Sequence, residues 1–145
     1  MKTILLTAAA LLSTLSLAAP ISAQEIPTPT QQLLETRECY GCDLRNANLK
    51  GAHLIGVDLR NADLAGANLE QANLEGADLT GANLHSADLT DAFVNGTTFD
   101  YANLTNADLS DANLYNAQVN GAVMIGTNIN GADGFDINLG IGGEE

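Results

Sequence analysis

Apolar residues recur at every fifth position through most of the chain, from Leu44 to Ile129. All 18 positions of this series are apolar, and 13 of them are Leu. The residue two places before each of these central positions is small: 15 of the 19 slots from Cys42 to Ala132 are Ala. No insertion shifts the period anywhere in this span, which indicates one structural unit repeated in tandem.

A period of five fits neither an α-helix nor a flat β-strand. Five helical steps of about 100° place successive leucines about 140° apart around the cylinder, so no apolar face forms. On a flat strand, an odd period sends alternate leucines to opposite faces. Within one unit, however, the small residue and the central residue are two positions apart, and a short extended stretch points both inward. The next two residues must then turn, and a chain that turns in one sense every five residues winds into a solenoid.

The turning positions are rich in residues that tolerate a positive φ angle, as tight corners require. The predicted corners are Gly51, Gly56, Gly66, Gly76, Gly81, Gly96, Gly121, Gly126 and Gly131, with Asn46, Asn61, Asn106 and Asn116. The sequence therefore predicts an all-β solenoid with a narrow aliphatic interior.

Units such as Ala62-Asp63-Leu64-Ala65-Gly66 resemble the A-(D/N)-L-x-x unit of pentapeptide-repeat proteins. The resemblance covers about residues 42–132. It implies a right-handed quadrilateral β-helix with four units, about 20 residues, per coil. Residues 33–44 also resemble the start of exported cyanobacterial and chloroplast-lumen members. The family as a whole has no shared enzymatic activity.

The first 23 residues have the layout of a secretory signal peptide. Lys2 precedes an aliphatic run from Ile4 to Leu17, and Ala23 supplies a small residue before the predicted cleavage point. The run is too short for a stable membrane span, and an uncleaved N-terminal anchor is the alternative. We expect export to the periplasm or a thylakoid lumen, with the extracellular space as a further destination.

Caps are predicted at both ends of the solenoid. Residues 24–41 form a linker and a short capping helix, which a capping box at Thr28–Gln31 starts, with Pro29 at the first helical position. This helix should end near Glu38 and place Leu33 and Leu34 over the first coil. The period fails at Gly134, so residues 133–145 are expected to form a C-terminal cap and tail. The apolar residues of this cap are Phe135, Ile137, Leu139 and Ile141.

Cys39 and Cys42 form a C-x-x-C pair where the repeat begins. A thioredoxin-like pair needs its first Cys at a helix N-terminus, whereas this pair follows the predicted helix. A zinc site needs four ligands, and His53 and His85 are the only histidines in the chain. In an oxidising compartment we expect a structural disulfide, with two small buried thiols as the alternative.

The chain is strongly acidic, with a formal net charge of −13. This charge excludes electrostatic attraction to nucleic-acid phosphates or to an anionic membrane, so we expect no direct nucleic-acid binding. From Asn61 to Glu145 there are 13 acidic residues and no Lys or Arg. Aromatic residues make up 4% of the chain and Trp is missing, so the interior must be built from Leu and Ala.

Residues 20 apart should stack in columns on the outer surface, where Lys50 would meet Glu70. Carboxylates then lie over one another and repel unless a cation, water or protonation relieves them. Weak divalent-cation binding by such columns is a minor alternative to a solvated acidic wall. The carboxylate pairs are Asp43 over Asp63, Asp58 over Asp78, and Asp88 over Asp108.

Nothing in the sequence predicts catalysis. No nucleophile–base–orienter set or Gly-rich phosphate loop occurs, and a convex rod with a filled interior offers no deep pocket. His53 and His85 are interpreted as surface residues on different sides. We expect no enzyme and no cofactor.

A few outward positions carry apolar residues instead of polar ones. By counting, Ile55, Phe93 and Tyr115 share one side of the solenoid, while Val123 and Ile125 lie near the C-terminal end. Single exposed apolar residues are ordinary. The functional alternative is a partner-binding face or an end-to-end dimer contact, so either a monomer or such a dimer is expected.

Two functions therefore follow from the sequence. The first is an exported, non-catalytic structural or protein-interaction module that presents an acidic repeat surface to an unknown protein partner. The second, implied by the resemblance alone, is a DNA-mimicking modulator of a type II topoisomerase, as some pentapeptide-repeat proteins are. The predicted signal peptide favours the first, because DNA topoisomerases are cytoplasmic.

Overall fold

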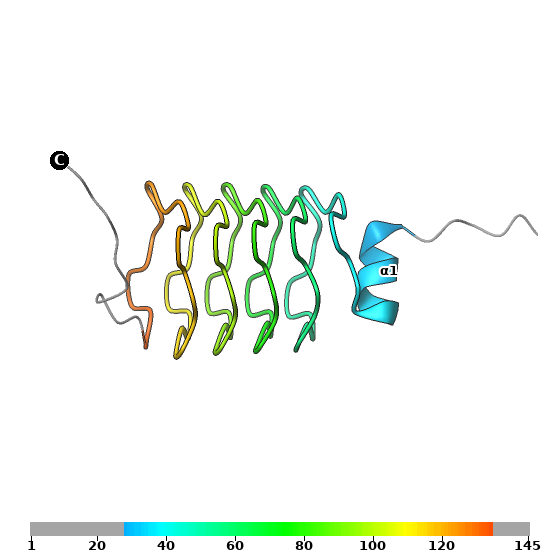
Figure 1. Ribbon diagram of the computed structural model, residues 1–145. Helices are drawn as coiled ribbons and strands as arrows, with labels where there is room; N and C mark the ends of the chain where they lie inside the picture. Colours follow the sequence, from blue (N-terminus) through cyan, green and yellow to red (C-terminus); the bar gives the residue numbers. More distant parts are fainter. Residues whose placement is uncertain (1–27, 135–145) are drawn as a thin grey trace, which may run out of the picture.

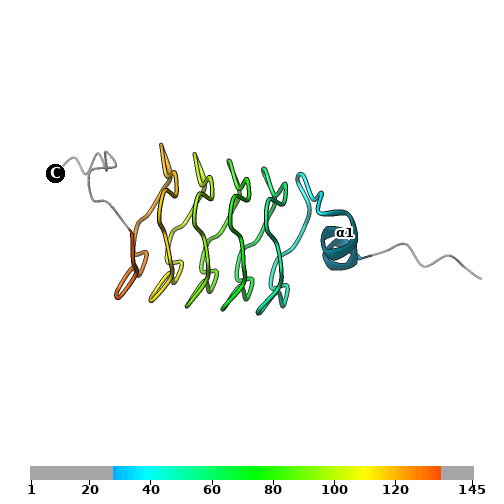
Figure 2. The same cartoon turned by 90° about the horizontal axis from the view of Figure 1, so that it is seen from below.

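The computed structural model describes residues 28–134, which form one helix followed by a stack of coils (Figure 1). The helix, α1 (Pro29–Thr36), lies at one end of the stack, and two perpendicular views show the coils side by side along one axis (Figures 1 and 2). Parallel β-bridges join residues that are 20 apart, from Glu38↔Asp58 to Asn113↔Asp133. Each coil therefore holds four five-residue units. Its right-handed sense remains a prediction.

Backbone hydrogen bonds tie each unit to the coils on both sides. Leu64 donates its N–H to the carbonyl of Asn83 at 2.8 Å, and Asp63 donates to the carbonyl of Cys42 on the other side at 2.8 Å. Ala67 closes the turn within the unit by donating to the carbonyl of Leu64 at 2.9 Å. The chain turns so often that pairing is limited to single bridges, with no longer strand between residues 28 and 134.

The polar residue before each central residue has a local structural task. The side-chain oxygen of Asp63 accepts the backbone N–H of Ala65 at 3.2 Å, and Asn68 does the same for Glu70 at 3.0 Å. An Asp or Asn side chain that accepts from the backbone two residues later stabilises a turn. This bond explains why most units carry Asp or Asn in that slot.

Every predicted corner in the described chain has a positive φ, between 55° at Asn46 and 73° at Gly131. The corners that the sequence reading missed carry other residue types in the same left-handed conformation. These are Gln71, Ser86, Asp91, Tyr101 and Asp111. An L-residue other than Asn or Asp in this region costs about 1–2 kcal/mol, so the repeated ladder, rather than local preference, holds the corners at Gln71, Ser86 and Tyr101.

The interior is a continuous column of Leu and Ala side chains. Central residues from Leu44 to Leu114 are at most 2% exposed. Thr97 replaces an inward Ala, and its hydroxyl donates to the carbonyl of Leu74 at 2.7 Å, so the buried oxygen is satisfied. Burial weakens in the last described coil, where Met124 is half-buried and Ile129 is 37% exposed.

The N-terminal capping box is confirmed. Thr28 accepts the backbone N–H of Gln31 at 3.2 Å, and the Gln31 side chain accepts the backbone N–H of Thr28 at 2.9 Å. The helix ends at Thr36, earlier than predicted, because Arg37 adopts the left-handed conformation with φ 61°. The prediction that Leu34 covers the first coil is wrong: Leu33 is fully buried, but Leu34 is 52% exposed. Neighbours on a helix point about 100° apart, so only one of them faces the coil.

The predicted signal peptide, residues 1–23, lies outside the described residues, as do Phe135, Ile137, Leu139 and Ile141 of the predicted C-terminal cap. Between residues 28 and 134, no helix has the length and apolar character needed to cross a membrane.

Candidate interaction surface

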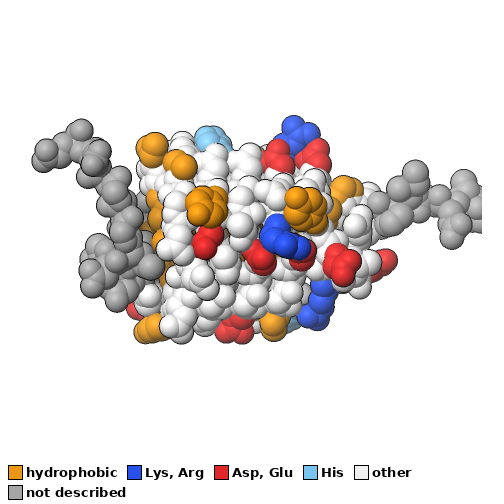
Figure 3. Space-filling view, in the orientation of Figure 1, with side chains coloured by type: hydrophobic (Ala, Val, Ile, Leu, Met, Phe, Trp, Pro, Cys, Tyr) orange, Lys and Arg blue, Asp and Glu red, His pale blue; other side chains and the backbone are white. Residues whose placement is uncertain are grey.

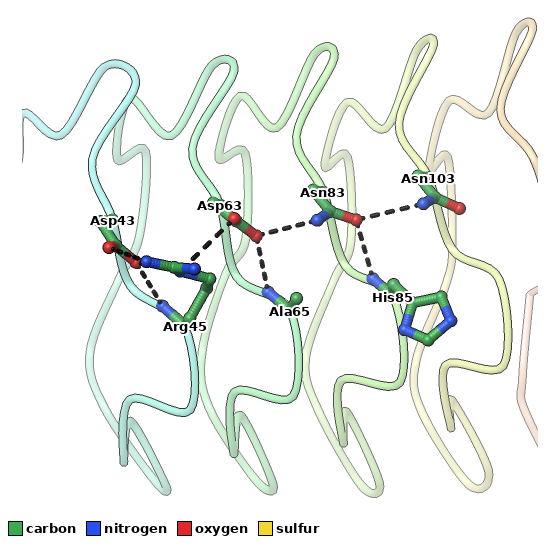
Figure 4. A network of polar contacts seen from close by, with 7 residues as sticks. All are labelled: Asp43, Arg45, Asp63, Ala65, Asn83, His85 and Asn103. Carbon is green, nitrogen blue, oxygen red and sulfur yellow. Dashed lines mark hydrogen bonds and ion pairs between the residues drawn. The ribbon is translucent and has the colours of Figure 1, made fainter.

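In the first predicted carboxylate column, an arginine of the chain itself pairs with both carboxylates and reduces their repulsion. Asp43 and Asp63 pair across a parallel bridge, as the 20-residue count requires. Arg45 lies between them, with Nη2 2.5 Å from Asp43 Oδ2 and Nε 3.7 Å from Asp63 Oδ2 (Figure 4). Hydrogen bonds from the Arg45 side chain, and then from its backbone, lower the pKa of Asp43 to about 2.

The second column repeats this arrangement. Arg60 Nη2 lies 2.7 Å from Asp58 Oδ2, and its Nε lies 3.7 Å from Asp78 Oδ2. The side-chain hydrogen bond from Arg60 lowers the pKa of Asp58. The guanidinium also lies 5.7 Å from the centre of the Tyr40 ring, within cation–π range. In each of these two columns, the cation that reduces the repulsion between the carboxylates is thus the arginine two residues after the first Asp of the pair.

The third column has no such partner. Asp88 and Asp108 pair across a bridge, and each accepts the backbone N–H two residues later. The side-chain hydroxyl of Ser110 donates to Asp108 at 2.6 Å and lowers its pKa, with a smaller contribution from Asn128. No group of three His, Cys, Asp or Glu side chains within residues 28–134 is arranged to hold a metal ion.

Amide side chains extend the first column into a ladder along the rod. Asn83 Nδ2 donates to Asp63 Oδ1 at 2.8 Å, and Asn103 Nδ2 donates to Asn83 Oδ1 at 3.1 Å (Figure 4). Lys50 Nζ lies 2.6 Å from Glu70 Oε2, as the sequence predicts. Much of the polar surface is therefore already engaged in contacts within the chain.

Charge is distributed unevenly along the axis. The four basic residues of the described chain, from Arg37 to Arg60, all lie in the half nearest α1, where Figure 3 shows the Lys and Arg side chains. Acidic residues continue to Asp133. The later coils therefore present carboxylates that no Lys or Arg of residues 28–134 accompanies.

The outward apolar residues lie where counting predicts. Backbone bonds connect the column of Ile55 to that of Tyr115 through Glu75 and Asn95, and bridges join Phe93 to the same side. Ile55 is 46% exposed, Phe93 47% and Tyr115 54%. The other predicted pair, Val123 and Ile125, belongs to the opposite side, above the ladder of Asn103. Their role as an interaction surface remains a prediction.

An open groove of about 550 Å³ lies beside Phe93, which the sequence reading did not find. Its lining residues come from successive coils: Gln71, Asp91, Phe93, Asp111, Ala112, Asn113 and Asp133. The groove runs along a corner column and the outward column that follows it by two residues, and only the 20-residue coil stacks the residues of successive units into these columns.

The two cysteines are bonded to each other, and the two histidines lie at the surface. Cys39 is buried and Cys42 is half-buried, and the structure joins their sulfur atoms at 2.05 Å. The exposed His53 and His85 lie on different sides; the ring of His85 bonds only its neighbour Ser86 among the described residues, at 3.1 Å.

Eight copies of the pentapeptide repeat are recognised in the sequence, over residues 38–76, 58–96, 77–114 and 102–133. The chain belongs to the pentapeptide-repeat family. Among solved structures, it is 38% identical to a pentapeptide-repeat protein from the thylakoid lumen of Arabidopsis thaliana, with a TM-score of 0.65 over 68% of this chain and 69% of the other. It is 35% identical to HetL of Nostoc sp. PCC 7120, which is involved in heterocyst differentiation regulation; the TM-score is 0.56, over 68% of this chain and 50% of HetL.

More remote pentapeptide-repeat proteins include QnrB1, a plasmid-mediated fluoroquinolone resistance protein, at 20% identity and a TM-score of 0.28, over 68% of this chain and 64% of QnrB1. No curated protein matches the sequence. Pentapeptide-repeat proteins are in general structural or interaction modules, so membership fits a surface that binds rather than one that catalyses.

Proposed function

We propose that this pentapeptide-repeat protein is an exported, non-catalytic interaction module that presents an acidic, flat-sided rod to a partner protein. The observation that carries the proposal is the change of charge along the axis. Near α1, one arginine bridges each of two pairs of stacked carboxylates, whereas from Asn61 onward the chain has acidic residues and no Lys or Arg. An uncompensated surface favours a basic partner and speeds its encounter.

Two observations support export. The first 23 residues have the layout of a signal peptide, and a structural neighbour at 38% identity comes from a thylakoid lumen. We place the protein in the periplasm or a thylakoid lumen. We also propose that Cys39 and Cys42 are oxidised there, since such compartments maintain disulfides.

The second candidate is a DNA-mimicking modulator of a type II topoisomerase. The run of 13 acidic residues without Lys or Arg from Asn61 to Glu145 favours it, because a mimic must carry negative charge along its length. The predicted export opposes it. Cation binding by Asp43, Asp63, Asp58 and Asp78 is less favoured, since Arg45 and Arg60 already occupy those columns.

The test is made on the protein from its native host. N-terminal sequencing should find a mature start near Gln24, and crosslinking in the exported fraction should join the rod reproducibly to one basic protein. A full-length cytoplasmic chain would contradict the proposal. Stoichiometric inhibition of gyrase supercoiling by that chain would then support the mimic.

A further inference from the structure

Phe93 occupies a slot in which most units carry Asp or Asn. In those units the polar side chain accepts the N–H two residues later, as Asp88 does for Thr90 at 3.0 Å. Phe93 gives up this bond and leaves an aromatic ring 47% exposed. Its backbone keeps the ordinary ladder, donating to the Ala72 carbonyl at 2.9 Å. The fold therefore does not need a ring here.

The ring lines one wall of the groove of about 550 Å³. Asp91 and Asp111 line the same groove from the adjoining corner column, one coil apart, and Asp133 lies two coils beyond Phe93 in the column of the ring itself. Coils stack at about 4.8 Å, so Asp91 and Asp111 form a short row beside the column of the ring.

No Lys or Arg of residues 28–134 forms an ion pair with this row. The column of Asp43 and Asp63 holds Arg45, but none of Asp91, Asp111 and Asp133 forms an ion pair within residues 28–134. The last basic residue in the sequence is Arg60, more than one coil before Asp91. An exposed aromatic face beside unpaired carboxylates attracts a cation through the ring quadrupole and through the charges.

We propose that this groove docks an extended, Lys- or Arg-bearing segment of the partner protein, with one cationic side chain over the Phe93 ring and others against the carboxylate row. This rests on the proposed function and adds where the partner binds and by what chemistry. A nucleic acid or anionic membrane would be repelled. A bare metal ion is disfavoured because the described chain has no three-ligand cluster.

The first experiment maps binding on the full chain by amide NMR. The probe is a nine-residue peptide of alternating Lys and Ser, compared with its Glu–Ser counterpart at the same ionic strength. The Lys peptide should shift the amides around Asp91, Phe93, Asp111 and Asn113, and the Glu peptide should shift none of them. Equal shifts on all four sides would indicate a diffuse ion atmosphere and overturn the proposal, as would no shift at all.

Variants separate the ring from the charges. Phe93→Leu keeps an apolar side chain but removes the π face, so it should weaken binding of the Lys peptide about threefold, and Phe93→Tyr should restore it. An unchanged affinity in Phe93→Leu would contradict the role of the ring.

A matched pair of double variants tests the carboxylates. Asp91→Asn with Asp111→Asn should weaken binding about tenfold at low salt, because Asn keeps the left-handed corner but removes two charges. The control, Asp88→Asn with Asp108→Asn, removes the same charge from the neighbouring side and should weaken it by less than threefold. Equal losses in the two variants would overturn the site.

Crosslinking to the native partner tests the groove and the interaction module separately. If the Phe93→Leu, Asp91→Asn, Asp111→Asn triple variant crosslinks to the partner as well as the unaltered chain does, the groove is wrong but the interaction module stands. If the unaltered chain crosslinks to no partner, both fail. Loss of the crosslink in the triple variant, with retention in the control, supports both.

Discussion

The two halves of the rod differ in what accompanies their stacked carboxylates. Near α1, Arg45 and Arg60 each bridge two Asp side chains on successive coils. In the later coils, Asp108 is served by a hydroxyl and an amide, and Asp91 and Asp111 face an open groove. The backbone is the same in both halves. The difference therefore teaches that the repeat specifies the fold, while the outward residues decide which half is left available to a partner.

Burial also distinguishes the two halves, and core substitutions should give the largest difference. Leu64→Ala in the fully buried interior should lower the free energy of unfolding by about 3 kcal/mol. Met124→Ala in the half-buried last coil should cost about 1 kcal/mol. Urea denaturation followed by circular dichroism measures both. Equal losses would mean that the last coil is as tightly packed as the middle of the rod.

The second prediction concerns the N-terminal junction. Replacing both Cys39 and Cys42 with Ala should lower the free energy of unfolding by about 2 kcal/mol, as expected when a disulfide closes a loop of this short length. A reductant should destabilise the unaltered protein and leave the variant unaffected. Mass spectrometry of the exported protein should show two hydrogens fewer than the dithiol. Two freely alkylated thiols would contradict the proposed bond.

A reciprocal exchange tests the arginine bridges. Thr90 follows Asp88 as Arg45 follows Asp43, and in each case another Asp lies one coil farther on. Arg45→Thr should lower the thermal midpoint by about 1–3 °C at low salt, and Thr90→Arg should raise it by a similar amount, because exposed ion pairs are weak. Both changes should largely vanish in high salt. A midpoint that is unchanged in both variants at low salt would show that the bridges add no stability.

The smallest effect is the dependence on pH. The pKa of Asp43 is lowered to about 2 by its hydrogen bonds with Arg45, so folding favours the charged carboxylate. The stability from this group is therefore present above about pH 4 and lost as the pH falls toward 2. Carboxyl NMR should find the Asp43 midpoint near pH 2 in the unaltered protein. In Arg45→Ala, which leaves no side-chain donor at this position, it should move up toward the ordinary Asp range; an unmoved midpoint would exclude the Arg45 side chain as the cause.

The sequence predicts the coil well because its period forces every unit to repeat one geometry. The motif at Thr28–Gln31 predicted the capping box, and the 20-residue coil implied by the family resemblance predicted the carboxylate columns and the shared side of Ile55, Phe93 and Tyr115. The arginine bridges were missed, although the spacing of Arg45 after Asp43 was a readable signal. Gln71 and Tyr101 were missed as corners because their left-handed conformation is imposed by neighbouring coils. The groove beside Phe93 combines residues of successive coils, 20 positions apart, so no local stretch of sequence encodes it.

The unbroken register of 20 residues per coil limits how the length of this protein can change. Removing residues 71–90 would bring Glu70 before Asp91 with every column still aligned, shortening the rod by one coil. Removing five residues would move each later residue onto the adjacent side and separate Phe93 from the columns that precede it. Whole coils are therefore the natural increment of gain and loss, and the distance between the arginine bridges and the groove can be altered in fixed steps of about 4.8 Å.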